Sequence, residues 1–191
     1  FTGAVSLRGW NTKIKDVNAI DLGTIRTGAI FKVQAGGAVT DSGVLTLLAK
    51  LEIQAATHDV TLDTASNDLH GSSKKVEIIA ANVILVDADA IVLGASTVSG
   101  TYRIKAGGNI TDDGILAVTR ASSFTTTATD ATIGLDADFT HALSGTVTLK
   151  TTGSSANAEV DNGTTALILG DGTSVDGTPL ATSVGGDLTL T

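Results

Sequence analysis

A long internal repeat constrains this chain more than any other feature. Residues 16–47 align without a gap to residues 87–118, which defines a 71-residue repeat. The shared positions include Ala19-Ile20, Leu22-Gly23 and Ala35-Gly36-Gly37, which recur as Ala90-Ile91, Leu93-Gly94 and Ala106-Gly107-Gly108. A degenerate third copy begins near residue 166 and reaches residue 189. Chains of this kind form solenoids, propellers or arrays, because each unit buries its hydrophobic face only against the next one.

A shorter rhythm within each copy predicts strands. Apolar and polar residues alternate over short runs, separated by Gly, Asn, Asp or Thr, and helical spacing is nearly absent. The expected strands include Ala4–Leu7, Phe31–Gln34, Leu51–Gln54, Val60–Leu62, Val76–Ile78, Tyr102–Lys105 and Val147–Leu149. Equivalent positions return every ~21–26 residues, roughly three times per long repeat, which suits one solenoid turn. We therefore predict an all-β, right-handed parallel β-helix (a β-solenoid) of about eight coils and roughly 40 Å in length.

Composition agrees with this fold and excludes several classes of protein. Hydrophobic residues make up 42% of the chain but aromatic residues only 3%, which suits a narrow, layered interior of Val, Ile and Leu. The absence of Cys excludes disulfides and thiolate metal sites. No apolar run approaches the ~20 residues of a membrane span. Residues 121–191 carry eight acidic side chains against Lys150 alone, which argues against binding to nucleic acid or anionic lipid.

The regularity of the repeat divides the chain into two parts. We expect regular β-helix repeats over residues 1–145, and degenerate coils with longer acidic loops over residues 146–191. Residues 151–165 and 171–178 are rich in Ser, Asn, Gly, Thr and Asp, which indicates loops or turns. Loops on a rigid scaffold are common places for molecular recognition.

Six glycines of the repeat are predicted to be structural corner residues. They are Gly23, Gly36, Gly37, Gly94, Gly107 and Gly108. We expect the chain to adopt positive φ at such corners, where a side chain would clash. A phosphate-binding loop is disfavoured, because neither Lys-Ser/Thr nor a following helix accompanies the paired glycines.

Acidic residues next to Gly or Asn suggest calcium as an alternative to simple turns. The candidates are Asp112, Asp113, Asp161, Asp171 and Asp176. Calcium needs about six to eight oxygen ligands, and turn chemistry explains Asp-Gly and Asn-Gly without a metal. His58, His70 and His141 are isolated in the sequence and are expected on the surface. We therefore expect neither a bound metal nor a cofactor.

Catalytic signatures are also missing. There is no Gly-x-Ser-x-Gly elbow beside a suitable His and Asp. Enzymes that degrade polysaccharides on a β-helix line their clefts with aromatic residues, whereas Trp10 and Tyr102 are the only Trp and Tyr of this chain. Ice binding would need outward Thr-x-Thr rows, which the long repeat does not keep. The chain is expected not to be an enzyme.

Several short segments of the sequence resemble the repeat region of filamentous haemagglutinin-type exoproteins. These are large bacterial proteins exported by two-partner secretion. The segments are residues 1–5, 19–23, 35–43, 60–63 with 67–69, and 93–100. The resemblance covers most of the chain up to about residue 145. It implies a right-handed β-helix, export through an outer-membrane transporter, an extracellular or cell-surface location, and a role in adhesion, biofilm formation or contact-dependent competition.

Three functions remain open at this point. The first is a rigid, adhesive rod segment whose parent protein contacts a host, bacterial or matrix surface, through protein or glycan. The second is a homopolymeric extracellular filament that associates end to end, because the outer strands of a solenoid offer unpaired backbone groups. The third, of a different class, is a carbohydrate-active β-helix enzyme.

Overall fold

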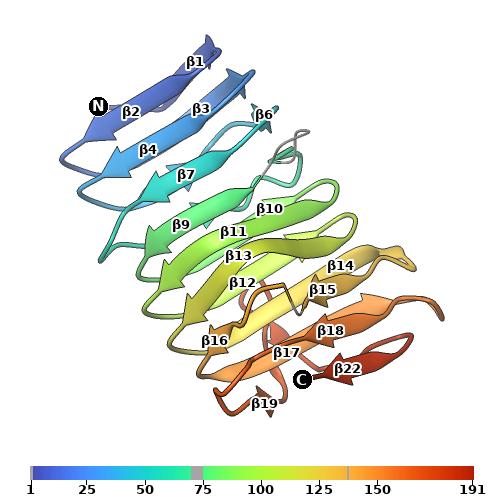
Figure 1. The fold of residues 1–191 in the computed structure, drawn as a ribbon. Coiled ribbons are helices and arrows are strands. Elements are labelled where there is room, and N and C mark those ends of the chain that lie inside the picture. Colours follow the sequence, from blue (N-terminus) through green and yellow to red (C-terminus); the bar gives the residue numbers. More distant parts are fainter. Residues whose placement is uncertain (1, 70–74, 137) are drawn as a thin grey trace.

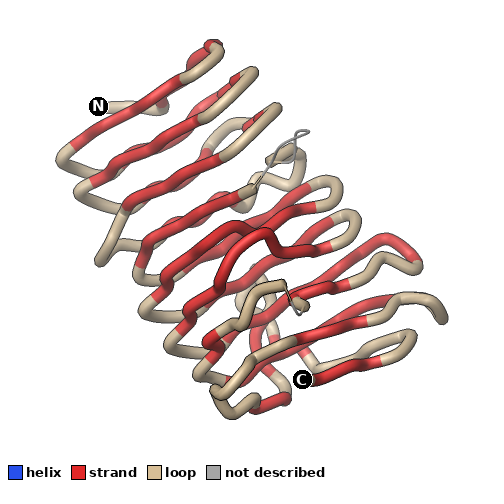
Figure 2. The backbone as a smooth tube through the Cα atoms, viewed as in Figure 1, coloured by secondary structure: helices blue, strands red, loops and turns tan. Residues whose placement is uncertain are grey.

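The structure, a computed structural model, describes residues 2–69, 75–136 and 138–191. The chain winds into a β-solenoid of about eight turns, which step regularly from the amino-terminal to the carboxy-terminal end (Figure 1). Every turn contributes to two parallel sheets that face each other across the interior. The described residues contain strands, turns and loops and no helix (Figure 2). The predicted all-β solenoid is confirmed.

The first sheet, sheet A, has ten strands among the described residues. They are β1 (Val5–Gly9), β3 (Ile20–Thr27), β5 (Val39–Asp41), β6 (Leu45–Leu47), β8 (Val60–Leu62), β10 (Val83–Asp87), β12 (Tyr102–Ala106), β14 (Ser122–Thr129), β17 (Thr146–Thr152) and β19 (Ile168–Leu169).

Sheet B also has ten described strands and lies opposite. They are β2 (Thr12–Asp16), β4 (Phe31–Ala35), β7 (Leu51–Gln54), β9 (Val76–Ala80), β11 (Ile91–Val98), β13 (Ile110–Val118), β15 (Ile133–Leu135), β16 (Ala142–Leu143), β18 (Ala158–Val160) and β22 (Leu188–Leu190). A separate antiparallel hairpin is formed by β20 (Gly172–Thr173) and β21 (Pro179–Leu180).

The length of a turn varies more than the sequence predicts. In sheet A the shortest step from one turn to the next joins Val5 to Leu22, and the longest joins Ser122 to Val147. The lower bound of the predicted ~21–26 residues per turn is therefore too long, because Val5 pairs with Leu22. The variation falls in the loops and in irregularities of the strand register, whereas pairs such as β10–β12 and β12–β14 keep their register throughout.

The long repeat makes three and a half turns, not three. Strand β3 belongs to sheet A, whereas its copy β11 belongs to sheet B. In the same way β4 of sheet B recurs as β12 of sheet A, and β5 with β6 of sheet A recurs as β13 of sheet B. Each copy of the repeat therefore presents on one side of the solenoid what the preceding copy presents on the other.

The degenerate third copy loses this alternation. Its first strand, β19, lies in sheet A as the half-turn rule requires, but β22, which follows Gly185-Gly186, lies in sheet B. The hairpin β20–β21 stands between these two strands, where the earlier copies have a solenoid strand. The hairpin, which lies outside the stack, thus takes the place of one solenoid strand and its half-turn.

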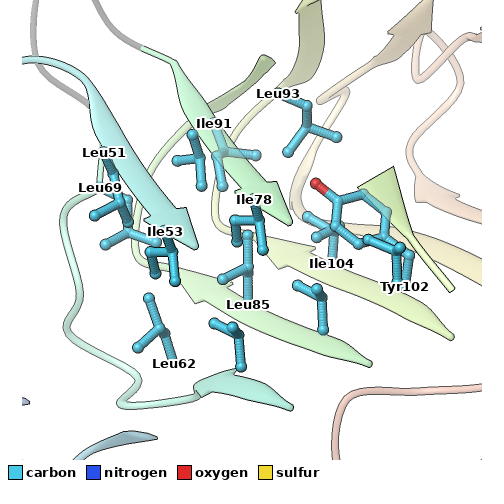
Figure 3. Packing of buried hydrophobic residues seen from close by; sticks show 14 of the residues in the cluster. Leu51, Ile53, Leu62, Leu69, Ile78, Leu85, Ile91, Leu93, Tyr102 and Ile104 are labelled. Atoms are coloured by element: carbon cyan, nitrogen blue, oxygen red, sulfur yellow. The ribbon is translucent and has the colours of Figure 1, made fainter. Parts of the chain in front are cut away.

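Aliphatic side chains fill the space between the two sheets in continuous rows. Leu62, Leu85, Ile104, Phe124 and Leu149 occupy successive turns of sheet A at the same register, and all are buried. Figure 3 shows Leu62, Leu85 and Ile104 facing Leu51, Ile53 and Ile78 from sheet B. Burial of this kind contributes about 1.5–3 kcal/mol per large side chain, so the rows provide the main stabilisation of the fold.

Candidate functional site

The paired corner glycines lie where the chain passes from one sheet to the other. Gly36 and Gly37 join β4 to β5, and Gly107 and Gly108 join β12 to β13. The expectation of positive φ at these positions is wrong, because the described glycines with positive φ are Gly153, Gly163 and Gly177.

The actual reason for glycine is the closeness of the preceding turn. A Cβ atom at Gly36 would lie 2.2 Å from the Val17 carbonyl oxygen, and one at Gly107 would lie 1.8 Å from that of Ala88. At Gly37 and Gly108 it would lie 2.6 Å and 3.0 Å from a backbone nitrogen. These corners are tight stacking points between backbones, with no room for a bound group.

Gly23 and Gly94 are placed differently from the other four. They lie inside β3 and β11, next to irregularities in the strand register, and not between strands. Their added Cβ atoms would meet side chains of the preceding turn, Ser6 Oγ at 2.3 Å and Glu77 Cγ at 2.6 Å. Positive φ is absent here as well.

The calcium candidates are held apart by separate local bonds. The Asp161 carboxylate accepts a hydrogen bond from the Gly163 amide at 2.7 Å, and that of Asp171 accepts one from the Thr182 amide at 3.0 Å. Asp176 accepts hydrogen bonds from Ser174 and Thr178, which lower its pKa to about 2. Across the described residues no three His, Cys, Asp or Glu side chains converge into a metal-binding group.

Asp112 and Asp113 are also engaged by protein groups. The exposed Asp113 carboxylate lies 3.1 Å from Lys75 Nζ, and the buried Asp112 side chain lies next to His141. Each candidate carboxylate therefore has a structural partner of its own, as the turn interpretation predicts for Asp161 and Asp176.

His141 is buried, so the expectation of a surface histidine is wrong for this residue. It is only 1% exposed, whereas His58 is exposed and His70 lies outside the described residues. His141 Nδ1 accepts a hydrogen bond from the Leu116 amide at 3.1 Å. Nε2 then lies 3.3 Å from Asp112 Oδ2, at ion-pair distance but without hydrogen-bond geometry.

Two asparagines occupy the same structural role as His141. Asn67 Oδ1 accepts a hydrogen bond from the Leu45 amide at 2.9 Å, and Asn162 Oδ1 accepts one from the Leu143 amide at 2.8 Å. All three polar side chains are buried, at most 1% exposed, and each reaches back to a leucine amide of the preceding turn. We call Asn67, His141 and Asn162 the internal brackets. Their role is structural, since each accepts a hydrogen bond from a backbone donor inside the stack.

Sheet B carries a network of charges on its outer surface. Lys32 pairs with Glu52, Lys50 Nζ lies 2.5 Å from Glu77, and Lys75 links Glu77 to Asp113. The Lys32 ammonium holds the pKa of Glu52 below its usual value. In this part of the sheet, Lys32, Lys50 and Lys75 are each neutralised by a neighbouring carboxylate.

The hairpin β20–β21 folds back over the outer surface of sheet A. Ser123 Oγ donates a hydrogen bond to the Thr173 carbonyl at 2.8 Å, and Thr148 Oγ1 donates one to that of Gly170 at 2.9 Å. Between hairpin and sheet lies a hollow of about 370 Å³, lined by residues that include Lys105, Lys150 and Asp176. The predicted turn at residues 171–178 thus forms one wall of a hollow on the rod.

A second hollow lies near the amino-terminal end of sheet A. It measures about 200 Å³ and is lined by Arg8, Trp10, Arg26, Thr46 and Leu48, together with Gly9, Thr27 and Gly28. Trp10 is 71% exposed and Leu48 53%. Sequence reasoning did not detect this site, because its residues are far apart in the chain and meet only when three successive turns stack.

Comparison with known proteins identifies the repeat. Residues 9–74 and 80–150 each match a family described as repeats of unknown function (DUF5649). The start of the second match falls one full repeat after the start of the first, in agreement with the internal repeat. The described residues contain no helix of the length and hydrophobicity that crossing a membrane requires. Searches among curated proteins and among solved structures gave no match. Since the two matches together span most of the chain, the chain belongs to the family of repeats of unknown function DUF5649.

Proposed function

We propose that this chain is a structural rod segment of a large, secreted bacterial surface protein of the filamentous haemagglutinin type. The observation that carries the proposal is the stack itself, in which both sheets continue through successive turns around a continuous, mostly aliphatic interior. Such a stack resists bending, because each turn is bonded to its neighbours along two sheets. The main property of the molecule is therefore that it is elongated and stiff.

The surface supports a passive rod with local recognition, and not catalysis. On the outer surface of sheet B, Lys32, Lys50 and Lys75 are paired with neighbouring carboxylates. The two hollows described above offer Arg, Lys, Thr and Trp side chains, which are groups that bind polar or anionic ligands. In this proposal the parent protein leaves the cell through an outer-membrane transporter, stays at the cell surface, and contributes to adhesion, biofilm formation or competition between cells.

Electron microscopy of the intact parent protein tests the rod. We expect single rods attached to cells, whose length grows by about 4.8 Å for every turn predicted from the sequence. Particles that are compact and globular would contradict the proposal. The control is a parent protein shortened by one long repeat, which should be about 17 Å shorter if a repeat makes three and a half turns.

A homopolymeric filament is the second candidate, and exposed apolar side chains on the last turn favour it. Leu188 and Leu190 of β22 are 40% and 44% exposed, and Ile168 of β19 is 54% exposed. Another turn, from the same parent chain or from a second copy, would cover them. The variant Leu188→Lys/Leu190→Lys should abolish filaments of the purified chain in negative stain, whereas a rod segment forms no filaments in either version.

A further inference from the structure

The corner that follows strands β1, β3 and β6 of sheet A differs from the rest of the rod in its side chains. Trp10, Gly28 and Leu48 form one row across three turns, and hydrogen bonds between neighbouring backbones hold this row in place. The middle position is a glycine, so the row has a notch between two large apolar side chains. The indole ring lies over that glycine, since a Cβ atom there would come within 2.4 Å of Trp10 Cε3. The ring therefore packs on the following turn, and 71% of the side chain is exposed.

Two arginines stand next to this row. Arg8 and Arg26 are paired in register on adjacent parallel strands, so their side chains leave the sheet on the same side, about 4.8 Å apart. Like charges placed directly opposite each other destabilise a sheet. The residues lining the hollow include no carboxylate, and within the described part of the chain neither arginine has an ion pair. Thr46 follows them in the next turn and is short, which leaves the hollow open.

The long repeat does not require this arrangement. One repeat further along the chain, the positions equivalent to Arg8, Trp10 and Arg26 are Ile79, Ala81 and Thr97. The solenoid forms there equally well, with β9 and β11 paired in the same way. This strand pairing therefore does not require the two cations and the indole.

We propose that the hollow between Arg8, Trp10 and Arg26 binds a uronate residue of an acidic polysaccharide. The guanidinium groups would hold the carboxylate from two adjacent turns, with the planar, charge-assisted hydrogen bonds that Arg forms with carboxylates. The exposed face of the Trp10 indole would pack against the C–H groups of the sugar ring. This binding site goes beyond the rod function, which stands or fails on the shape of the parent protein alone.

The fluorescence of Trp10 tests the site directly, because it is the only tryptophan of the chain. The probe is a hexamer of galacturonate, titrated into the purified chain at low salt and again at 0.5 M salt. We expect a saturable change in emission, with a Kd that rises at least tenfold at high salt as the ionic contact is screened. A hexamer in which the carboxylates are reduced to alcohols should bind at least tenfold more weakly.

Two variants and one matched control complete the experiment. Arg8→Gln and Arg26→Gln should each raise the Kd for the hexamer at least tenfold, whereas Arg120→Gln, which removes an exposed arginine far along the rod, should leave it unchanged. All three side chains are exposed, so equal thermal unfolding midpoints would show that folding is intact. Calorimetry with Trp10→Ala should show weaker binding as well.

Four outcomes would overturn the proposal. The first is unchanged emission of the unsubstituted chain at millimolar hexamer, and the second is binding by Arg8→Gln and Arg26→Gln that equals that of the unsubstituted chain. The third is binding of the reduced hexamer as tight as that of the galacturonate hexamer, and the fourth is equal or tighter binding of a hexa-aspartate peptide. The last result would assign the site to acidic protein segments and not to sugars.

Discussion

Asn67, His141 and Asn162, the internal brackets, are polar side chains in an interior that is otherwise mostly aliphatic. Each accepts a hydrogen bond from a leucine amide that the strand ladder leaves without a backbone partner. A buried donor without an acceptor costs about 1–3 kcal/mol. The brackets therefore satisfy these buried donors and avoid this loss.

Replacing His141 tests this role. His141→Ala removes the acceptor for the Leu116 amide and leaves Asp112 without its neighbour, so we expect a loss of about 2–4 kcal/mol in the free energy of unfolding. His141→Asn keeps an acceptor of the kind found at Asn67 and Asn162, and should lose clearly less. Urea unfolding of the three proteins measures the difference. Equal losses in the two variants would contradict the role of the hydrogen bond.

Tyr102 carries a buried hydroxyl group that the fold does not need. The side chain is fully buried, and no hydrogen bond to its hydroxyl is formed within the described structure. The neighbouring Ser96 hydroxyl is already engaged, because it donates a hydrogen bond to the Gly94 carbonyl and accepts one from the Ile78 amide. Burial raises the pKa of Tyr102, which reflects the same poor solvation.

The variant Tyr102→Phe should have a free energy of unfolding about 1 kcal/mol higher than that of the unsubstituted chain, because it removes an unsatisfied polar atom and keeps the ring. The first copy of the repeat already has Phe31 at the equivalent position. The edge-to-face contact with Phe124, at 6.0 Å between ring centroids, should persist. Thermal unfolding checks the sign, and a lower midpoint for the variant would refute the argument.

Asp87 gives the fold a dependence on pH. The residue is 2% exposed, and desolvation raises its pKa to about 6, even though the Asp89 and Leu69 amides donate hydrogen bonds to it. Between about pH 4 and pH 6 the folded state holds a proton that the unfolded state releases. Stability from this group is therefore highest below pH 4 and falls as the pH rises to 6, by about 2–3 kcal/mol.

The variant Asp87→Asn should lose this dependence while its amide oxygen still accepts a hydrogen bond from the Leu69 amide. We expect the variant to gain stability relative to the parent chain as the pH rises from 4 to 7. Urea unfolding of both proteins at several pH values gives the difference, in which the contributions of carboxylates that do not interact with Asp87 cancel. A difference that does not change with pH would contradict the assignment.

At the scale of the elements, the corners between the sheets depend on the absence of a side chain. The backbone of one turn occupies the place where a Cβ atom of the next turn would lie, most closely at Gly107. Since the obstacle is backbone, no side chain rearranges to make room. The corner must open, and the ladder bonds on both sides must lengthen.

Alanine substitutions at two glycines separate this effect from the general cost of replacing glycine. Gly107→Ala should destabilise the chain by about 2–4 kcal/mol through overpacking. Gly134→Ala, in strand β15, meets nothing closer than the Asp136 carboxylate at 3.9 Å and should be neutral or slightly stabilising. Chemical unfolding of the two variants provides the comparison. Similar losses for both would mean that the corner is not tightly packed.

Several elements could be predicted from the sequence alone, and the reason is local. The alternation at residues 31–34, 51–54 and 102–105 marks strands β4, β7 and β12 without reference to the rest of the chain. The corner glycines were found for the same reason, but their conformation was not. Their constraint comes from a carbonyl group one turn earlier in the chain, and no local pattern records it.

The polar sites could not be predicted, because their residues come from different turns. His141 acts on the Leu116 amide of the preceding turn, and its counterpart in the first copy is an asparagine at a different offset. Arg8 and Arg26 come together only through the register of β1 and β3. Loop lengths vary between turns, so the sequence does not reveal which side chains stack on which.

At the scale of the whole molecule, each turn is stabilised by its two neighbours, and the outer turns have one neighbour only. In solenoids of this kind stability is approximately the sum of such nearest-neighbour contacts. We therefore expect amide hydrogen exchange to be slowest in β10–β12 at the centre, and fastest in β1, β2, β19 and β22. Mass spectrometry on peptides resolves this profile. Uniform protection along the chain would instead indicate a single cooperative unit.

The half-turn of the repeat has a consequence for an array of many copies. A side chain that recurs in every copy points to opposite sides of the rod in alternate copies, about 17 Å apart along the axis, and returns to the same side after about 34 Å. Such an array presents the same number of these side chains on each of its two faces. A rod built in this way is suited to bridging two partners that lie on either side of it, whereas a repeat of a whole number of turns would line up every copy toward one partner.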